Sequence, residues 1–451
     1  MTARIDRLPA CRSTWLPIFL VSLAAIFEAY ELYQTAYLPP GLLAAGIFST
    51  SGLFGLSDQA AFGAVTFIGL FIGASCFSSV ADRLGRRSVF VYALIGYCAA
   101  SVAVACQSSA LGIDFFRMLA GIGLGVELVT IDTFLVEITP AHMRGRAFAL
   151  NHFVQYLGVP ALAFLSWRLI PVSPLGVAGW RWVVLIGAVG AVPVWFFRRA
   201  LPESPRWLAL QGRHKEADLI VAMMEAQALA DTGRPLAAPV DVSAEAAHEA
   251  RFSEMWKKPY GKRTIMLTVF NFFQSIGFFG FANWLPTLVA AKGHGITQSL
   301  LYSSCIALAY PVMPLVWYFT VAERFERKWL IVAAALGVAL VGPLFAIANS
   351  AAAIVSLGVG MTGFSVLLSL AYHPYQAELY PTQVRARAVG FVYSFSRLSA
   401  VFASFLVAFC LKEAGVAGVF ALISFSMTVM LVAIACFGPR TRGRALDEIA
   451  R

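Results

Sequence analysis

The sequence repeats itself at an offset of 241 residues, and this repeat constrains the fold more than any other feature. The stretch ADRLGRR, which begins at Ala81, returns as AERFERK from Ala322, with its acidic and basic positions kept. In the same register EITPAHMRGRA, from Glu137, returns as ELYPTQVRARA, from Glu378. Two unrelated clusters that share one offset predict two homologous halves, and in a strongly apolar chain such halves are two membrane bundles with a crevice between them.

The composition agrees with a membrane location. Of 451 residues, 59% are hydrophobic and only 13% are charged, which is too little polar surface to cover a soluble globule of this size. About twelve apolar stretches have the length of roughly 20 residues that a spanning helix needs. We therefore expect an all-α membrane protein with twelve transmembrane helices in two pseudo-symmetric six-helix bundles. The expected segments are a cytoplasmic tail (1–14), a first bundle (15–198), a cytoplasmic linker with a surface helix (199–263), a second bundle (264–437) and a cytoplasmic tail (438–451).

Lysine and arginine gather in the loops on one side of the expected bundles. This asymmetry predicts that both termini and the linker are cytoplasmic, as in a multi-pass protein of the inner (plasma) membrane. The net charge of +10 reflects the same bias, so it does not indicate nucleic-acid binding. The cysteines form no CxxC pair and the histidines lack the spacing of metal ligands, so no metal or cofactor is expected. The expected partners are the bilayer, a small-molecule substrate and protons, with the chain as a monomer.

The linker carries its own helix signal. Ser204 and Pro205 have the N-cap and first-turn chemistry of a helix start, and a mixed apolar and charged stretch follows them. A disordered segment is expected around residues 232–242.

The chain also resembles a known family along most of its length. ADRLGRR, RMLAGIGLG, EITPAHMRGR and PESPRWL together resemble the major facilitator superfamily, in the branch with sugar porters, organic-ion transporters and bacterial niacin and aromatic-acid permeases. FEAYELY and GLGVEL are most similar to the niacin and aromatic-acid permeases. The chain departs from the family loop motif at Ser78, where the family has glycine, and at Glu326, where the second copy lacks the central glycine.

The charged loop clusters have a mechanical interpretation, which the resemblance supports. They would hold the inner side closed and release it when the halves rock apart; the alternative is that the arginines only fix topology. The candidate gating residues are Asp82, Arg83, Arg86, Glu137, Arg144, Arg146, Glu323, Arg327, Glu378 and Arg385.

Charged residues inside expected spans are costly, so each requires a reason. Four acids and two arginines occur there, and close carboxylates in a low dielectric favour protonation of one of them. The candidate proton-coupling residues are Glu28, Glu31, Glu127 and Asp132. Of these, Glu28 or Glu31 is the expected coupling acid; the alternative is that one glutamate is a plain partner for Arg117.

Arg397 is the expected contact for an anionic cargo. It follows Arg387 by ten residues, which places it about 15 Å into the membrane. Its planar fork of donors matches a carboxylate, and the family's organic-anion carriers are similar in having an arginine in this helix. The alternative is a structural ion pair with Glu127 or Glu31.

Aromatic and amide side chains complete the expected binding site, although many aromatics serve packing only. The candidate substrate-binding residues are Arg397, Tyr30, Tyr33, Asn151, Gln155, Tyr156, Asn271, Gln274, Phe278, Trp284 and Tyr393. The glycines at 121, 123 and 125 are expected to pack helices rather than to bind a dinucleotide.

These features favour proton-coupled secondary active uptake of a small organic anion, an aromatic or heteroaromatic monocarboxylate such as niacin, by alternating access. A sugar or polyol carrier and an organic-cation carrier are the alternatives. No nucleophile–base set or metal cluster suggests an enzyme, and no P-loop suggests ATP-driven transport.

Overall fold

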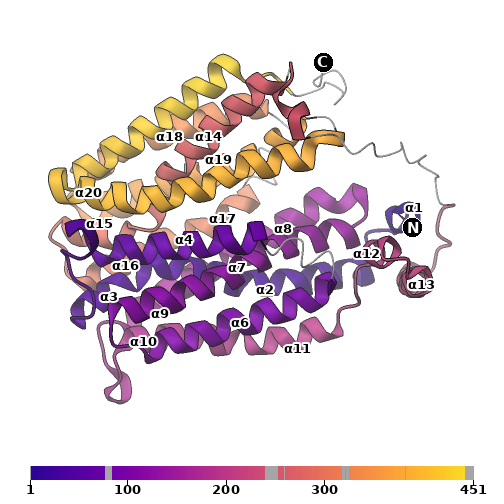
Figure 1. Ribbon diagram of the computed structural model, residues 1–451, viewed down its shortest axis with the longest axis horizontal. Helices are drawn as coiled ribbons and strands as arrows, with labels where there is room; N and C mark the ends of the chain where they lie inside the picture. Colours follow the sequence, from indigo (N-terminus) through magenta and orange to yellow (C-terminus); the bar gives the residue numbers. More distant parts are fainter. Residues whose placement is uncertain are drawn as a thin grey trace.

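The computed structural model describes residues 2–76, 84–238, 252–258, 260–316, 320, 325–380 and 382–441, without the side chains of residues 2, 197–200, 252, 382, 383, 385 and 386. All regular elements in these ranges are helices, in two bundles that lie against each other with their long helices running the same way (Figure 1). The long helices of the first bundle are α2 (Arg12–Tyr37), α4 (Asp58–Cys76), α6 (Arg86–Cys106), α7 (Ala110–Ile138), α8 (Arg144–Tyr156) with α9 (Gly158–Leu169), and α10 (Gly179–Gly190) with α11 (Val192–Ala200). Those of the second are α14 (Tyr260–Ala282), α16 (Ile296–Ala307) with α17 (Ala309–Val316), α18 (Arg327–Ile347), α19 (Ala351–Glu378) and α20 (Thr382–Phe437).

The described helices account for twelve spans. Eleven are long and apolar enough to cross a membrane, and the last of these, Arg387–Phe437, is two spans in one. Gly415 interrupts it with φ 62° and ψ −158°, a conformation that glycine adopts without a steric penalty. The expected fold class is therefore confirmed.

The internal repeat is visible in the helix boundaries. Adding 241 to the bounds of α6 gives those of α18. Ser109 caps α7 by accepting a hydrogen bond from a backbone N–H three residues on, and Ser350 caps α19 in the same way. The offset in the sequence is thus also a structural equivalence between the bundles.

The glycines of α7 allow close helix packing, as expected. A Cβ atom at Gly121 would lie 2.6 Å from the Thr66 carbonyl oxygen of α4, and one at Gly125 would lie 2.3 Å from the Leu70 carbonyl oxygen. A Cβ at Gly123 would lie 2.9 Å from the Tyr97 Cβ of α6. Side chains at these positions would push the helices apart.

The short helices lie at the two ends of the bundles. α1 (Thr2–Asp6), α12 (Pro205–Leu210) and α13 (His214–Thr232) mark one end, here called the linker end (Figure 1). α3 (Pro39–Ala44) and α15 (Leu285–Ala291) mark the other, the distal end. Short 3₁₀ helices cover Leu53–Gly55, Ala141–Met143, Pro174–Gly176 and Phe252–Trp256. The predicted helix start at Ser204 is confirmed, because its side chain accepts from the Trp207 N–H, 3.2 Å away. The single expected surface helix is instead two, since the chain turns at Gly212 with φ 75°.

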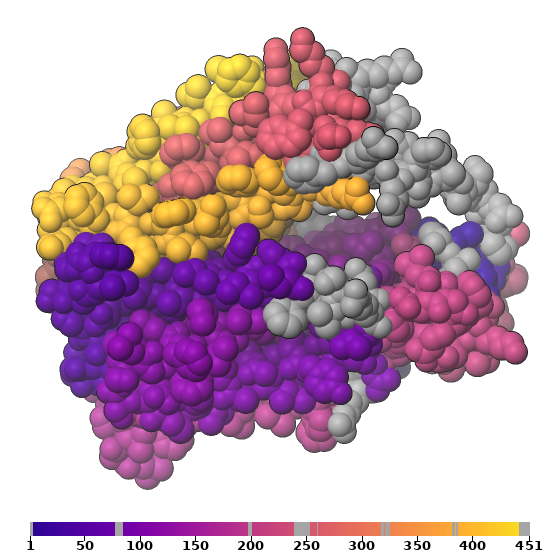
Figure 2. Space-filling view, viewed as in Figure 1, coloured from indigo at the N-terminus to yellow at the C-terminus, as the bar shows by residue number. Residues whose placement is uncertain are grey.

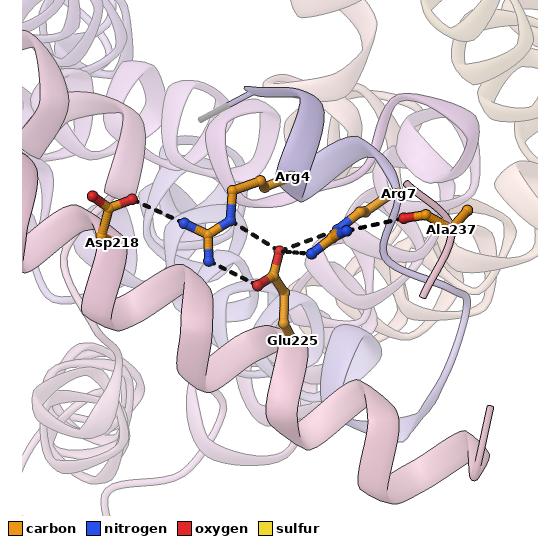
Figure 3. Close-up of polar contacts among 5 residues, drawn as sticks. All are labelled: Arg4, Arg7, Asp218, Glu225 and Ala237. Atoms are coloured by element: carbon orange, nitrogen blue, oxygen red, sulfur yellow. Dashed lines mark hydrogen bonds and ion pairs between the residues drawn. The ribbon is translucent and has the colours of Figure 1, made fainter. Parts of the chain in front are cut away.

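The chain's first helix is fastened to the linker (Figure 3). Arg4 forms two hydrogen bonds with the Glu225 carboxylate of α13, of 3.0 and 2.7 Å, and Arg7 adds two, of 3.1 and 2.6 Å. Beneath them Ile5 and Val221 are fully buried. The Arg4 guanidinium lowers the pKa of Glu225 by hydrogen bonding. We call residues 2–8 the strap.

The strap also reaches the first bundle. Asp6 accepts a hydrogen bond of 3.0 Å from the backbone N–H of Ala141, which lies between α7 and α8. Its carboxylate lies 3.7 Å from both Arg144 and Arg206. The strap therefore ties the linker to the linker end of the first bundle.

The two bundles are closed against each other at the distal end. Four hydrogen bonds between described residues join the bundles there: Tyr37 to the Ser303 carbonyl (3.3 Å), Gln59 to the Asn283 carbonyl (3.2 Å), Thr287 to Gln59 (2.8 Å) and Lys412 to the Gly55 carbonyl (3.0 Å). Figure 2 shows a recess between the bundles near α12 and α13. The bundles thus meet at the distal end and part towards the linker end.

Candidate functional site

A cavity of about 220 Å³ lies between the bundles. Helices α2, α7 and α8 of the first bundle line it together with α14, α19 and α20 of the second. Its volume is below the roughly 300–1,000 Å³ that is usual for drug-sized ligands, so it suits a smaller one. Its lining residues are Glu28, Ala29, Leu32, Tyr33, Leu128, Ile131, Asp132, Phe148, Asn151, His152, Gln155, Tyr156, Gln274, Phe278, Phe279, Ser369, Tyr372, His373, Tyr393, Ser396 and Arg397.

Many residues that line the cavity occupy equivalent positions in the two halves of the internal repeat. Positions 241 apart face the cavity together: Tyr33 with Gln274, Leu128 with Ser369, Ile131 with Tyr372, Asp132 with His373, His152 with Tyr393, Gln155 with Ser396, and Tyr156 with Arg397. Motif reasoning did not place His152, Ser369, Tyr372, His373 or Ser396 in the binding site. Applying the offset to the candidates would have found His373 from Asp132 and Ser396 from Gln155, and applying it in reverse to Tyr393 would have found His152. Ser369 and Tyr372 are equivalent to Leu128 and Ile131, which carry no such signal.

Ten of the predicted site residues line the cavity: Glu28, Asp132, Tyr33, Asn151, Gln155, Tyr156, Gln274, Phe278, Tyr393 and Arg397. Five others lie outside the lining: Glu31, Glu127, Tyr30, Asn271 and Trp284.

The three uncharged residues outside the lining have other contacts. Tyr30 donates its hydroxyl to the Val183 carbonyl of α10, 2.7 Å away. Asn271 donates to the Leu267 carbonyl of its own helix at 2.8 Å. Trp284 is buried in the core of the second bundle. The helical face assumed from sequence was therefore too wide, because residues on neighbouring turns of one helix diverge around its axis.

Arg397 is a buried cation in the cavity wall. Its side chain is 7% exposed, donates to the Tyr393 hydroxyl at 3.0 Å and lies 5.0 Å from the centre of the same ring. Within the described part of the chain it has no carboxylate within ion-pair distance. The alternative of an ion pair with Glu127 or Glu31 is therefore wrong for this structure. Four of its five N–H groups remain available to a ligand.

Arg117 of α7 is the opposite case. It lies 3.1 Å from Glu31 of α2 as an ion pair, and both side chains are fully buried. It also donates to Gln34 (3.2 Å) and Thr66 (3.1 Å), and Ser101 donates to the same glutamate at 3.0 Å. Glu31 is thus the partner of Arg117, which the sequence left open as one alternative.

Two carboxylates face the cavity. Glu28 is 3% exposed and accepts a hydrogen bond of 3.2 Å from Gln155. Asp132 is open to the cavity, and in the described ranges it has no hydrogen bond or ion pair. Glu127 is fully buried away from this lining.

Four of the described gating candidates form ion pairs within their own bundles. Arg86 lies 3.2 Å from Glu137, and at the equivalent positions Arg327 pairs with Glu378. Arg144 contacts the strap, and Arg146 is exposed. Asp82, Arg83, Glu323 and the Arg385 side chain lie outside the described residues.

Comparison with known proteins identifies the family. The model of the family described as "Sugar (and other) transporter" matches residues 29–451. The chain is 29% identical to the putative metabolite transport protein YyaJ of Bacillus subtilis, over 98% of this chain and 96% of the relative. It is 26% identical to the niacin transporter NiaP of Acinetobacter baylyi (100% and 99% covered) and 28% identical to a gallate transporter of Pseudomonas putida (89% and 86%).

A solved structure shares the fold. The inward-open xylose transporter XylE of E. coli superposes with a TM-score of 0.74 over 97% of this chain and 99% of that one, at 18% identity. The chain therefore belongs to the Sugar (and other) transporter family, within the major facilitator superfamily. It is a multi-pass membrane transporter and not an enzyme.

Proposed function

We propose that this member of the family is a proton-coupled carrier that takes up a small aromatic or heteroaromatic monocarboxylate by alternating access. The observation that carries the proposal is Arg397, a buried cation in the central cavity with no carboxylate partner among the described residues.

A buried guanidinium without a counter-ion is costly. A ligand carboxylate in the cavity would remove this cost through two parallel charge-assisted hydrogen bonds. The other buried arginines in the described part of the chain, Arg86 and Arg117, already have carboxylate partners in Glu137 and Glu31, so a ligand carboxylate would gain nothing from them. The contrast supports an anionic substrate held at Arg397.

The cavity walls favour a flat ring. Tyr33, Tyr156 and Tyr393 line it together with Phe278. Aromatic side chains pack favourably on the edges and faces of a ring-shaped ligand. Relatives that are named for niacin and gallate, both aromatic acids, agree with this choice.

Glu28 is the proposed site of the coupled proton. It faces the cavity, so water can reach it, whereas Glu31 is fully buried and neutralised by Arg117. A carboxylate couples proton and substrate movement if it binds a proton while the cavity is open to one side of the membrane and releases it while the cavity is open to the other. Asp132 is the second cavity acid and a further proton site of the same kind.

The state of the bundles supports alternating access. They are joined at the distal end and part at the linker end, where the arginines of α1, α8 and α12 gather. By the positive-inside rule the linker end is cytoplasmic in the inner membrane, and the cavity then opens inward. The ion pairs Arg86–Glu137 and Arg327–Glu378 would shape the surfaces that meet when this end closes.

The proposal is tested by uptake of radiolabelled benzoate or nicotinate into proteoliposomes with an imposed pH gradient. We expect Arg397→Ala to abolish uptake while the exposed control Arg168→Ala retains it. Thermal unfolding in detergent checks that both variants are folded. Uptake of both acids by Arg397→Ala at the wild-type rate would reject the proposal.

A sugar substrate is the second candidate. The amides of Asn151, Gln155 and Gln274 in the cavity, and the fold shared with a xylose transporter, favour it. In the same proteoliposomes, gradient-driven uptake of D-xylose without uptake of any aromatic acid would favour this candidate.

A further inference from the structure

We propose that the cavity selects aromatic acids that carry a hydroxyl on the ring, through two hydrogen-bond acceptors, the Nε2 atoms of His152 and His373. The inference rests on the proposed function, because it assumes that the carboxylate is held at Arg397. It adds which ring substituents are accepted.

The hydrogen bonds of the two histidines fix their tautomers. Nδ1 of His152 lies 2.8 Å from the Phe148 carbonyl oxygen, and Nδ1 of His373 lies 2.7 Å from the Ser369 carbonyl oxygen. A carbonyl oxygen only accepts, so Nδ1 carries the proton in both rings. In the neutral imidazole Nε2 is then an acceptor, and it points away from the helix backbone because it lies across the ring from Nδ1.

Each bundle contributes one of these acceptors. His152 belongs to α8 and His373 to α19, and both line the cavity. The His373 ring lies 5.7 Å from the ring of Tyr393, whose hydroxyl receives the Arg397 hydrogen bond. A ring whose carboxylate is held at Arg397 is therefore within reach of a histidine acceptor.

Other polar groups of the cavity wall also favour a ligand that donates a hydrogen bond. Asn151 is 2% exposed and lines the cavity, and its Oδ1 atom has no hydrogen-bond partner in the described part of the protein. The carboxylates of Glu28 and Asp132 are acceptors when ionised. A phenolic hydroxyl would satisfy such a group, whereas an unsubstituted ring or a pyridine nitrogen would leave it unpaired.

The consequence is a measurable preference. A site built to bind a substrate hydroxyl rejects analogues that lack it, because its own polar groups then stay unsatisfied. We expect 4-hydroxybenzoate or 3-hydroxybenzoate to bind on the order of tenfold more tightly than benzoate, and nicotinate to bind no better than benzoate.

The test is equilibrium binding of these four acids to the full-length protein in detergent, at a pH where the histidines are neutral. In His152→Phe or His373→Phe, which keep a ring but remove the acceptor, the ratio of hydroxybenzoate affinity to benzoate affinity should fall several-fold. The matched variants His152→Gln and His373→Gln, which restore an acceptor, should recover it. Thermal unfolding confirms that each variant is folded.

The outcomes separate the two proposals. The histidine inference is overturned if the wild type binds benzoate and both hydroxybenzoates equally, or if both Phe variants keep the hydroxyl preference. It fails alone if Arg397→Ala still weakens the binding of every acid. If Arg397→Ala leaves all affinities unchanged, the proposed function fails instead.

Discussion

The two bundles share a scaffold but not a chemistry. The bounds of α6 and α18, the serine caps of α7 and α19 and the linker-end ion pairs match at one offset. In the first bundle Glu31 and Arg117 form a buried ion pair. At the equivalent positions, the second bundle has Phe272 and Gly358, where the Ile306 side chain lies 2.3 Å from an added Cβ. Duplication thus preserved the frame, while the buried charges diverged.

Two of the buried arginines, Arg117 and Arg397, show what this divergence means. Arg117 is saturated by groups of its own bundle, whereas Arg397 of the second bundle faces the cavity with one protein hydrogen bond. In the first bundle the residue equivalent to Arg397 is Tyr156. One arginine therefore stabilises its bundle, and the other is left for a ligand.

Neutralising Glu28 should uncouple substrate transport from the proton gradient. Glu28→Gln removes the proposed proton site of the first bundle, so accumulation of acid driven by a pH gradient should be lost while exchange of labelled for unlabelled acid continues. Paired uptake and exchange assays in proteoliposomes measure this. Normal accumulation would place the coupling elsewhere, and Asp132→Asn is the next variant to compare.

Breaking the buried pair should cost the most stability. Glu31→Gln leaves Arg117 as an uncompensated buried charge, which costs about 3–5 kcal/mol in comparable pairs. The double variant Glu31→Gln with Arg117→Met should recover part of this loss. Thermal unfolding in detergent is the measurement, and a single variant as stable as the wild type would contradict the assignment of Arg117 as structural.

Replacing Arg397 should change the stability less than breaking the Glu31–Arg117 pair. Arg397→Met removes a buried cation that has no carboxylate partner among the described residues, so we expect the free energy of unfolding to change by less than about 1 kcal/mol or to increase. A loss as large as that of Glu31→Gln would mean that the two arginines do not differ in role.

The sequence predicts the features that leave a pattern along the chain, and it misses those that depend on how the helices pack against one another. The repeat and the length of the apolar stretches predict both bundles, because a helix needs about 20 apolar residues to span the bilayer. Intramembrane charges are also visible in sequence, and both arginines were singled out. Their partners were not, because Glu28 and Glu31 are three residues apart and only the packing of α2 against α7 decides which one meets Arg117. Tyr30 and Trp284 were misplaced for the same reason, since aromatic composition does not specify the face that a helix presents.

The smallest expected effect concerns the strap, a feature of the first bundle for which the second has no described counterpart. Arg4 lowers the pKa of Glu225, so this contact stabilises the protein above the unfolded pKa of about 4.3 and is lost as the pH falls through the lower folded value. Because the pair is near the surface, its contribution should be under about 1 kcal/mol. Hydrogen exchange of residues 2–8 should increase in Glu225→Gln at neutral pH and in the wild type at acidic pH. Unchanged exchange in the variant would show that Glu225 does not hold the strap.

The central claim is that Arg397 holds the carboxylate of the substrate, and the most direct test compares ligands that differ only in that group. The affinities of benzoate and its neutral amide, benzamide, are measured by calorimetry on the wild type and on Arg397→Ala. The account predicts that the wild type binds benzoate at least tenfold more tightly than benzamide and that this difference disappears in the variant. Equal binding of the two ligands by the wild type, or a preference for benzoate that survives in Arg397→Ala, would contradict it.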